Sequence, residues 1–396
     1  MRRALTLTVI ALVAFPWGAS AQDPPPPANG LVEFGKKTIA VFQKPVHPIL
    51  ETVAPGGWLG AGLGYNTQKL WNNQAFASVE GVFTIRQYWN TEANFGLQGT
   101  RYRVESYARA RDMKRLPLSG LGNNTEQTDL TTFRLLDREI GGIGSVRFGA
   151  VAVGGRIESL WPELKPGEGN DVPSFEQRFT EETLPGMVSQ PHFAHYQTFV
   201  NVDYPYDLNA RGFTGGDYRL AFSYVRDGEQ DRYSFRRLTG EVQQRIPGLR
   251  DDQRLTLHGL ISTTYTPAGN TVPFYLQGTL GGAGSVRAYN DEIIGTDGSK
   301  ATLRGFDDLR FRGPHLLLLQ AEYRFTVWGP IDATAFVDAG KVTLNRSDLD
   351  LRDFEHDYGG SLSLMTGDAT AVRVDFGFGG GEGAHVFFSI GPIFAQ

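Results

Sequence analysis

The sequence predicts an all-β fold, a transmembrane antiparallel β-barrel for which sixteen strands are expected. Large apolar or aromatic residues alternate with small or polar ones, as in Tyr218–Tyr224, which is the period of a strand with two different faces. The alternating segments run to about ten residues, the length of tilted membrane-spanning strands rather than of soluble ones. The chain also has 49 glycines and 12% aromatic residues, and beyond its N-terminus no apolar run is long enough for a membrane helix.

The N-terminus predicts export. Arg2 and Arg3 precede the apolar run 4–15, and the small residues 19–21 follow it, which together are typical of a secretory signal peptide. The run is too short for a transmembrane helix, which needs about 20 apolar residues. Removing the two arginines takes the formal net charge from −5 to −7, and this acidic balance argues against a nucleic-acid partner.

We expect three segments: a signal peptide over 1–21, a periplasmic N-terminal linker over 22–57 and the barrel over 58–396. The run Asp23-Pro24-Pro25-Pro26-Pro27 indicates an extended linker, and no second linker of this kind divides the remaining chain. The absence of cysteine excludes disulfides, cysteine-containing zinc sites, thiol nucleophiles and an acyl-lipid attachment site. No cofactor and no metal are expected.

Alternation defines fifteen strand segments. They are residues 58–66, 74–86, 87–99, 101–112, 125–139, 144–157, 196–206, 217–226, 233–246, 254–265, 314–327, 331–339, 357–365, 370–379 and 385–394. Single-chain bacterial barrels have even numbers of strands. We therefore expect a sixteenth strand, hidden in 83–139 or in the long polar stretch 160–195.

The predicted connections are short at one end of the barrel and long at the other. Trp328-Gly329-Pro330 is short, whereas 266–313 and 340–356 are long. Short turns face the periplasm and long loops face outward. The largest outer loop contains one pattern twice, as Val286-Arg287-Ala288-Tyr289-Asn290-Asp291 and as Leu303-Arg304-Gly305-Phe306-Asp307-Asp308.

Five short sequence motifs in the C-terminal half resemble those of a known family. They are Leu280-Gly281-Gly282, Leu303-Arg304-Gly305-Phe306, Arg310-Phe311-Arg312-Gly313, Glu322-Tyr323-Arg324-Phe325 and Phe336-Val337-Asp338-Ala339-Gly340. In this order they resemble the bacterial surface antigen family, the outer-membrane barrels that include barrel-assembly proteins and two-partner-secretion transporters. The resemblance implies a bacterial outer-membrane location and the insertion or translocation of protein or lipid, with outer-membrane lipid and unfolded protein clients as partners.

The resemblance also implies that the long outer loop folds back into the barrel lumen, where its arginine meets acidic residues of the inner wall. Strand parity permits this, because alternation points Glu322 and Asp338 inward on neighbouring strands. A guanidinium suits two carboxylates better than an ammonium would. The second motif copy keeps Gly305, which allows closer approaches than Ala288 of the first copy. We therefore expect Leu303–Phe306 to be the working copy, with Arg304 paired to both acids.

The remaining C-terminal features also carry expectations. The last strand should close the barrel and act as its assembly signal, through Phe388, Gly391 and Phe394. The glycines between 377 and 383 predict a pliable last outer hairpin.

Family members carry periplasmic polypeptide-binding modules ahead of the barrel. The segment 22–57 is too short for one, which favours a passive pore or structural barrel, whereas a separate periplasmic partner would favour assembly or translocation.

Motifs for other functions are incomplete. Gly30–Lys37 lacks the final Ser or Thr of a phosphate-binding loop. His192 and His195, three residues apart, would lie on opposite faces of a strand, which disfavours a metal site. The sequence has no G-x-S-x-G motif, which would carry a serine nucleophile, and we expect that the protein is not an enzyme. Three functions remain open: an assembly or translocation barrel, a passive pore or structural barrel, and an enzyme built on a barrel.

Overall fold

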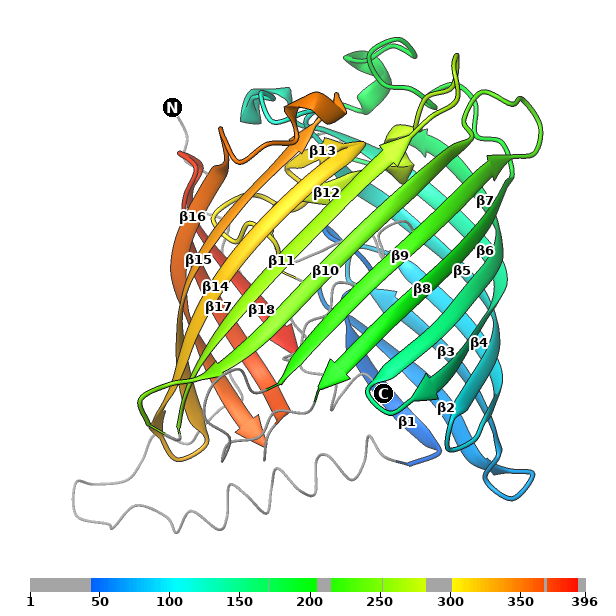
Figure 1. Ribbon diagram of the computed structural model, residues 1–396. Coiled ribbons are helices and arrows are strands. Elements are labelled where there is room, and N and C mark those ends of the chain that lie inside the picture. The colour runs from blue at the N-terminus through cyan, green and yellow to red at the C-terminus, as the bar shows by residue number, and fades with distance from the viewer. Residues whose placement is uncertain are drawn as a thin grey trace. The chain divides into compact units, whose positions relative to one another are not determined.

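The computed structural model describes residues 44–169, 171–204, 215–250, 252–282, 301–366 and 369–390. Its main element is a 16-stranded antiparallel sheet, arranged as a barrel in Figure 1. The strands are β1 (Val46–Glu51), β2 (Gly60–Leu70), β3 (Ala75–Thr84), β4 (Trp89–Gln98), β5 (Tyr102–Leu118), β6 (Thr131–Phe148), β7 (Val151–Pro166), β8 (Phe193–Tyr204), β9 (Gly216–Asp227), β10 (Phe235–Pro247), β11 (Gln253–Tyr265), β14 (His315–Trp328), β15 (Ile331–Thr343), β16 (Glu355–Thr366), β17 (Ala369–Gly379) and β18 (Gly383–Ile390). Each strand pairs with the next along this order, which confirms the predicted fold class and strand number.

The connections contain the remaining elements. These are the two-stranded sheet of β12 (Gly278–Leu280) and β13 (Phe311–Gly313), and the 3-10 helices η1 (Gln127–Asp129), η2 (Phe175–Gln177), η3 (Phe274–Leu276) and η4 (Arg346–Asp348). None of the helices in the described ranges is long and apolar enough to cross a membrane.

The sixteenth strand is β1, and the prediction that it lies in 83–139 or 160–195 is wrong. Val46–Glu51 falls within the segment predicted as a linker, yet all six of its residues pair with β2, from Val46 opposite Tyr65 to Glu51 opposite Gly60. The strand escaped recognition because it is short and contains Pro48, a residue confined to sheet edges or bulges. The barrel therefore begins ahead of residue 58. Residues 1–43, which include the predicted signal peptide over 1–21, lie outside the described ranges.

The two faces of the wall differ as alternation predicts. On β14, Leu319, Tyr323 and Phe325 face outward with 36–42% of their surface exposed. On β15, Thr334 and Asp338 face inward and are at most 4% exposed. This is the inverted pattern of a membrane barrel, with an apolar exterior and a polar lumen.

The connections have the predicted asymmetry. Gly149-Ala150 and Gly329-Pro330 are two-residue turns at the end where short turns are expected, and both glycines have positive φ, +61° and +54°. The connections at the opposite end include 167–192 and 266–314. In a bacterial barrel the end with long loops faces the exterior.

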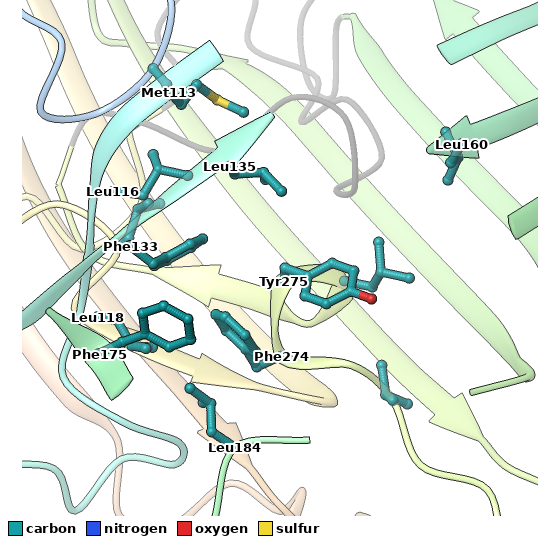
Figure 2. Packing of buried hydrophobic residues seen from close by; sticks show 14 of the residues in the cluster. Met113, Leu116, Leu118, Phe133, Leu135, Leu160, Phe175, Leu184, Phe274 and Tyr275 are labelled. Atoms are coloured by element: carbon teal, nitrogen blue, oxygen red, sulfur yellow. The ribbon is translucent and has the colours of Figure 1, made fainter. Parts of the chain in front are cut away.

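An apolar cluster of buried side chains lies at this outer end of the barrel, and Figure 2 shows how Phe133, Phe175 and Phe274 pack within it. We call it the outer apolar cluster. Its members come from the outer ends of β5 to β10 and from loops that cover them, and the largest include Met113, Leu116, Leu118, Phe133, Phe175, Phe193, Tyr233, Phe235, Phe274 and Tyr275, each at most 4% exposed. Because these side chains face inward or come from loops, they fill the outer part of the lumen rather than contact lipid.

Candidate functional site

The long connection between β11 and β14 carries the second motif copy into the lumen. Its β12–β13 sheet is held inside the wall, with Leu280 1% and Phe311 2% exposed. Leu303 and Phe306 are buried with them in an apolar cluster that includes Leu318 of β14 and Val342 of β15. This packing carries the backbone of the motif to the inner face of β14 and β15.

Arg304 is the centre of the site and is only 1% exposed. Its Nε donates to Oδ2 of Asp338 at 2.8 Å, and Nη2 donates to Oδ1 of the same carboxylate at 2.6 Å. Nη1 donates to Glu322. The guanidinium carbon lies 3.5 Å from the ring centroid of Phe336, which forms a cation–π contact beneath it. The structure thus brings together Arg304, Glu322 and Asp338, the three charged residues predicted to meet.

Two further charged residues, on β17, complete the site. Arg373 donates to Glu322 through Nη2 at 2.9 Å and to Asp375 through Nε at 2.9 Å. Asp375 in turn lies 3.6 Å from Nη1 of Arg304 and accepts a 2.6 Å hydrogen bond from Ser361 of β16. We call Arg304, Glu322, Asp338, Arg373 and Asp375 the lumen ion-pair cluster.

Sequence reasoning missed the β17 residues although part of the signal was present. Alternation over 370–379 already places Arg373 and Asp375 opposite the apolar positions of that strand. Their contact with Arg304 depends on β17 lying two strands beyond β15, a separation that sequence spacing does not encode.

Close backbone approach explains three glycines around the cluster. A Cβ at Gly377 would overlap the carbonyl oxygen of Arg304, and one at Gly380 would overlap the ring of Phe306. A Cβ at Gly305 would lie 2.5 Å from that of Asp357. The loop tip therefore packs directly on β17 and the last hairpin. Gly377 and Gly380, which belong to the hairpin predicted to be pliable, provide the space for the loop.

A second ion pair fixes the loop near the outer end. Arg310 pairs with Glu382 of the β17–β18 hairpin, and its Nη1 donates to Thr125 Oγ1 at 2.6 Å. Glu382 also accepts from the backbone amide of Asp307 at 3.3 Å. The lumen loop is thereby joined both to the last hairpin and to the β5–β6 connection.

The charges of the lumen ion-pair cluster are mutually dependent. Three carboxylates face two guanidiniums, and four of these five side chains are at most 3% exposed. A buried charge without a partner is strongly destabilising, by about 3–5 kcal/mol when one partner of a pair is removed. The arrangement can hold the loop rigidly in the lumen.

The other predicted site residues lie elsewhere or outside the described ranges. Phe388 is on the lipid-facing side of β18 and is 57% exposed, away from the lumen. Gly391 and Phe394 of the predicted assembly signal, and Arg287 of the first motif copy, lie outside the described ranges. His192 stacks on Trp161, whereas His195 bonds to Glu158 at 2.6 Å, so the two histidines do not converge. Within the described ranges, no group of His, Asp and Glu has the geometry of a metal site.

The cluster lies within a domain that is found in other proteins. Residues 212–394, which contain all five of its members, match the Omp85 superfamily domain. Residues 212–394 are therefore similar to the Omp85 superfamily domain. The resemblance to the surface antigen family is thereby confirmed, and the chain is a bacterial outer-membrane protein. No curated protein sequence matches it.

Several solved structures have a similar fold. BamA from Haemophilus ducreyi lacking POTRA domains 1–3 has a TM-score of 0.57 at 13% identity, over 92% of this chain and 78% of that chain. CdiB from Acinetobacter baumannii has a TM-score of 0.54 at 12% identity, over 88% and 60% of the two chains. CdiB from Escherichia coli has a TM-score of 0.56 at 15% identity, over 87% and 62%. The chain thus spans less than two thirds of either CdiB structure, and at these identities the likeness concerns the fold.

Proposed function

We propose that this barrel handles protein clients, inserting or translocating them at the outer membrane through the junction between its first and last strands. The observation that carries the proposal is the state of these strands. β1 and β18 stand at the two ends of the strand order, and within the described ranges each pairs with a single neighbour. An unpaired strand edge is a template on which a further strand can add.

The composition of β1 supports this role. It covers only six residues of β2, which itself has eleven, and Pro48 has no amide to donate to a neighbour. A short, partly paired end strand separates from its neighbour at a lower cost than a long strand does. The lumen ion-pair cluster meanwhile holds β14, β15 and β17 around the loop, which would keep the rest of the wall intact while the junction opens.

The outer apolar cluster favours this function over that of a passive pore. A conducting channel needs a water-filled lumen, and aromatic side chains such as Phe133 and Phe274 occupy the outer part of this one. The proposal assigns no catalytic step to the chain.

Cross-linking across the junction tests the proposal. The chain has no native cysteine, so cysteines introduced in β1 and β18 can be joined by a bifunctional reagent without side reactions. The matched control joins Tyr65→Cys to Val79→Cys, which are register partners on β2 and β3. We expect the junction cross-link to abolish insertion of an unfolded barrel client into liposomes and the control to retain it.

Two results would contradict the proposal. One is client insertion that continues with the junction closed. The other is steady ion conductance without any client, equal in the cross-linked and free proteins, which would indicate a passive pore. Running the insertion assay with and without a periplasmic extract shows whether a separate periplasmic partner is required.

A further inference from the structure

The outward face of the barrel carries a row of aromatic and basic residues at its outer end. Tyr196 of β8 lies opposite Tyr224 of β9 in the sheet register. Tyr224 also lies opposite Arg236 of β10, which in turn lies opposite Tyr265 of β11. Arg346 of η4 extends the row, with its guanidinium carbon 4.6 Å from the ring centroid of Tyr265. We call these five residues the arginine–tyrosine row. With neighbouring strands about 4.8 Å apart, its four strands span about 14 Å.

The row faces the membrane rather than the lumen. Tyr196 and Tyr265 are 44% and 38% exposed, and Arg236 is exposed as well. Arg236 is the second residue of β10 and Tyr265 the last of β11, which places them where the outer ends of these strands meet the membrane surface. At this depth an outward arginine costs about 0–1 kcal/mol, compared with about 2–4 kcal/mol at the bilayer midplane.

The arginines of the row have no acidic partner among the described residues. Among the described residues, no salt bridge is formed by Arg236, by Arg346 or by Arg226, which faces outward on β9. The lumen-facing arginines of β9 and β10 do have partners. Arg245 of β10 pairs with Asp217, and Arg219 of β9 donates a hydrogen bond to Gln197 at 3.2 Å. The outward arginines therefore expose positive charge that no acidic side chain of the described residues pairs with.

Stacking holds these guanidiniums in place and leaves their edges available. Arg236 lies 6.0 Å from the ring centroid of Tyr224, whose ring stacks on that of Tyr196 at 6.4 Å. A guanidinium that contacts a ring through its face keeps its N–H groups directed outward, and these suit bidentate bonds to phosphate. Tyrosine is itself enriched at membrane interfaces, where its hydroxyl meets the headgroups.

We propose that the arginine–tyrosine row, together with Arg226, binds the phosphate of a phosphorylated lipid in the outer leaflet of the outer membrane. Charge complementarity, the position at the outer strand ends and the outward orientation all point to this occupant. The proposal concerns the outside of β8 to β11 and is independent of the junction between β1 and β18.

Lipid binding to the purified barrel tests the proposal. Native mass spectrometry in detergent would compare retention of phosphatidylglycerol, which is anionic, with that of phosphatidylcholine, which carries no net charge. We expect preferential retention of phosphatidylglycerol, and about fivefold weaker binding in each of Arg236→Gln and Arg346→Gln, the contribution typical of one basic side chain near an anionic lipid surface. Arg236→Lys should bind with intermediate strength, because it keeps the charge but loses the fork and the stacking.

The control is Arg250→Gln, which removes an exposed arginine at the opposite end of the barrel, where it pairs with Asp252. We expect this variant to bind phosphatidylglycerol as the parent does, and all variants to keep the heat-modifiable band of a folded barrel. Equal loss in Arg250→Gln, or equal retention of both lipids by the parent, would overturn the proposal. Full displacement of phosphatidylglycerol by millimolar inorganic phosphate would also overturn it, since it would show a site for a free anion rather than for a lipid.

Discussion

At the scale of single residues, Arg304 is the side chain on which the lumen loop depends. Its removal leaves Asp338 without its bidentate partner, whereas Glu322 keeps Arg373. Because Arg304 is 1% exposed, we expect Arg304→Ala to cost about 3–5 kcal/mol. Arg304→Lys should recover only part of this, since an ammonium cannot span two carboxylates as a planar fork does. Protease cleavage of the loop and the temperature at which the folded band is lost in gels measure both effects.

The first motif copy supplies the control for this prediction. Arg287→Ala should leave protease resistance and heat stability unchanged if Leu303–Phe306 is the working copy. Equal effects of the two alanine substitutions, or a silent Arg304→Lys, would show that the assignment of the second copy is wrong.

At the scale of elements, the loop tip and β17 approach each other at backbone distance. Gly377→Ala would place a methyl group against the carbonyl of Arg304, so either the loop or β17 must shift. We expect the loop to become accessible to protease. Gly81→Ala is the matched control, because a Cβ at this strand glycine would meet open space. If the two variants behave alike, the close approach is not needed for loop placement.

The outer loop between β7 and β8 should respond to acid through Glu181. Burial raises the pKa of this carboxyl, but hydrogen bonds from Tyr233 Oη at 2.6 Å and from the amides of Gly186 and Val188 outweigh it and hold the pKa below its usual range. A carboxyl whose pKa is lower in the folded than in the unfolded state stabilises the fold at pH values above the usual glutamate pKa, about 4.3. This stabilisation is lost as the pH falls through the lowered pKa.

We therefore expect amide hydrogen exchange of residues 175–190, corrected for its intrinsic pH dependence, to accelerate in acid. Glu181→Gln should remove this pH dependence. An acid response that persists in this variant would assign it to another group.

At the scale of the whole molecule, the outer apolar cluster should make the barrel a poor conductor. Phe274 is fully buried and packs edge-on against Phe133, with ring centroids 5.0 Å apart. Phe274→Ala should cost about 3–5 kcal/mol and raise the frequency of conducting events in planar bilayers. Phe83→Ala, at a 57% exposed position of β3, is the control and should leave conductance unchanged. High conductance of the parent protein would contradict the sealing role of the cluster.

The sequence by itself determined the features that depend on local periodicity. A strand repeats every two residues whatever its partners are, so alternation alone placed Glu322 and Asp338 in the lumen and Leu319 toward lipid. The same argument, with the even strand number of closed barrels, predicted sixteen strands from fifteen visible ones. The five motifs shared with the family then indicated that Arg304 would contact Glu322 and Asp338.

Only the tertiary structure decided what depends on pairing between distant segments. β1 is recognisable as a strand through its ladder with β2, because six residues with a central proline show little periodicity of their own. Arg373 and Asp375 reach Arg304 of the lumen loop because β16 and β17 follow β15 around the barrel. The outer apolar cluster likewise forms from strands and loops far apart in sequence. Such contacts depend on the register between strands and on the paths of the loops, which no local pattern of residues encodes.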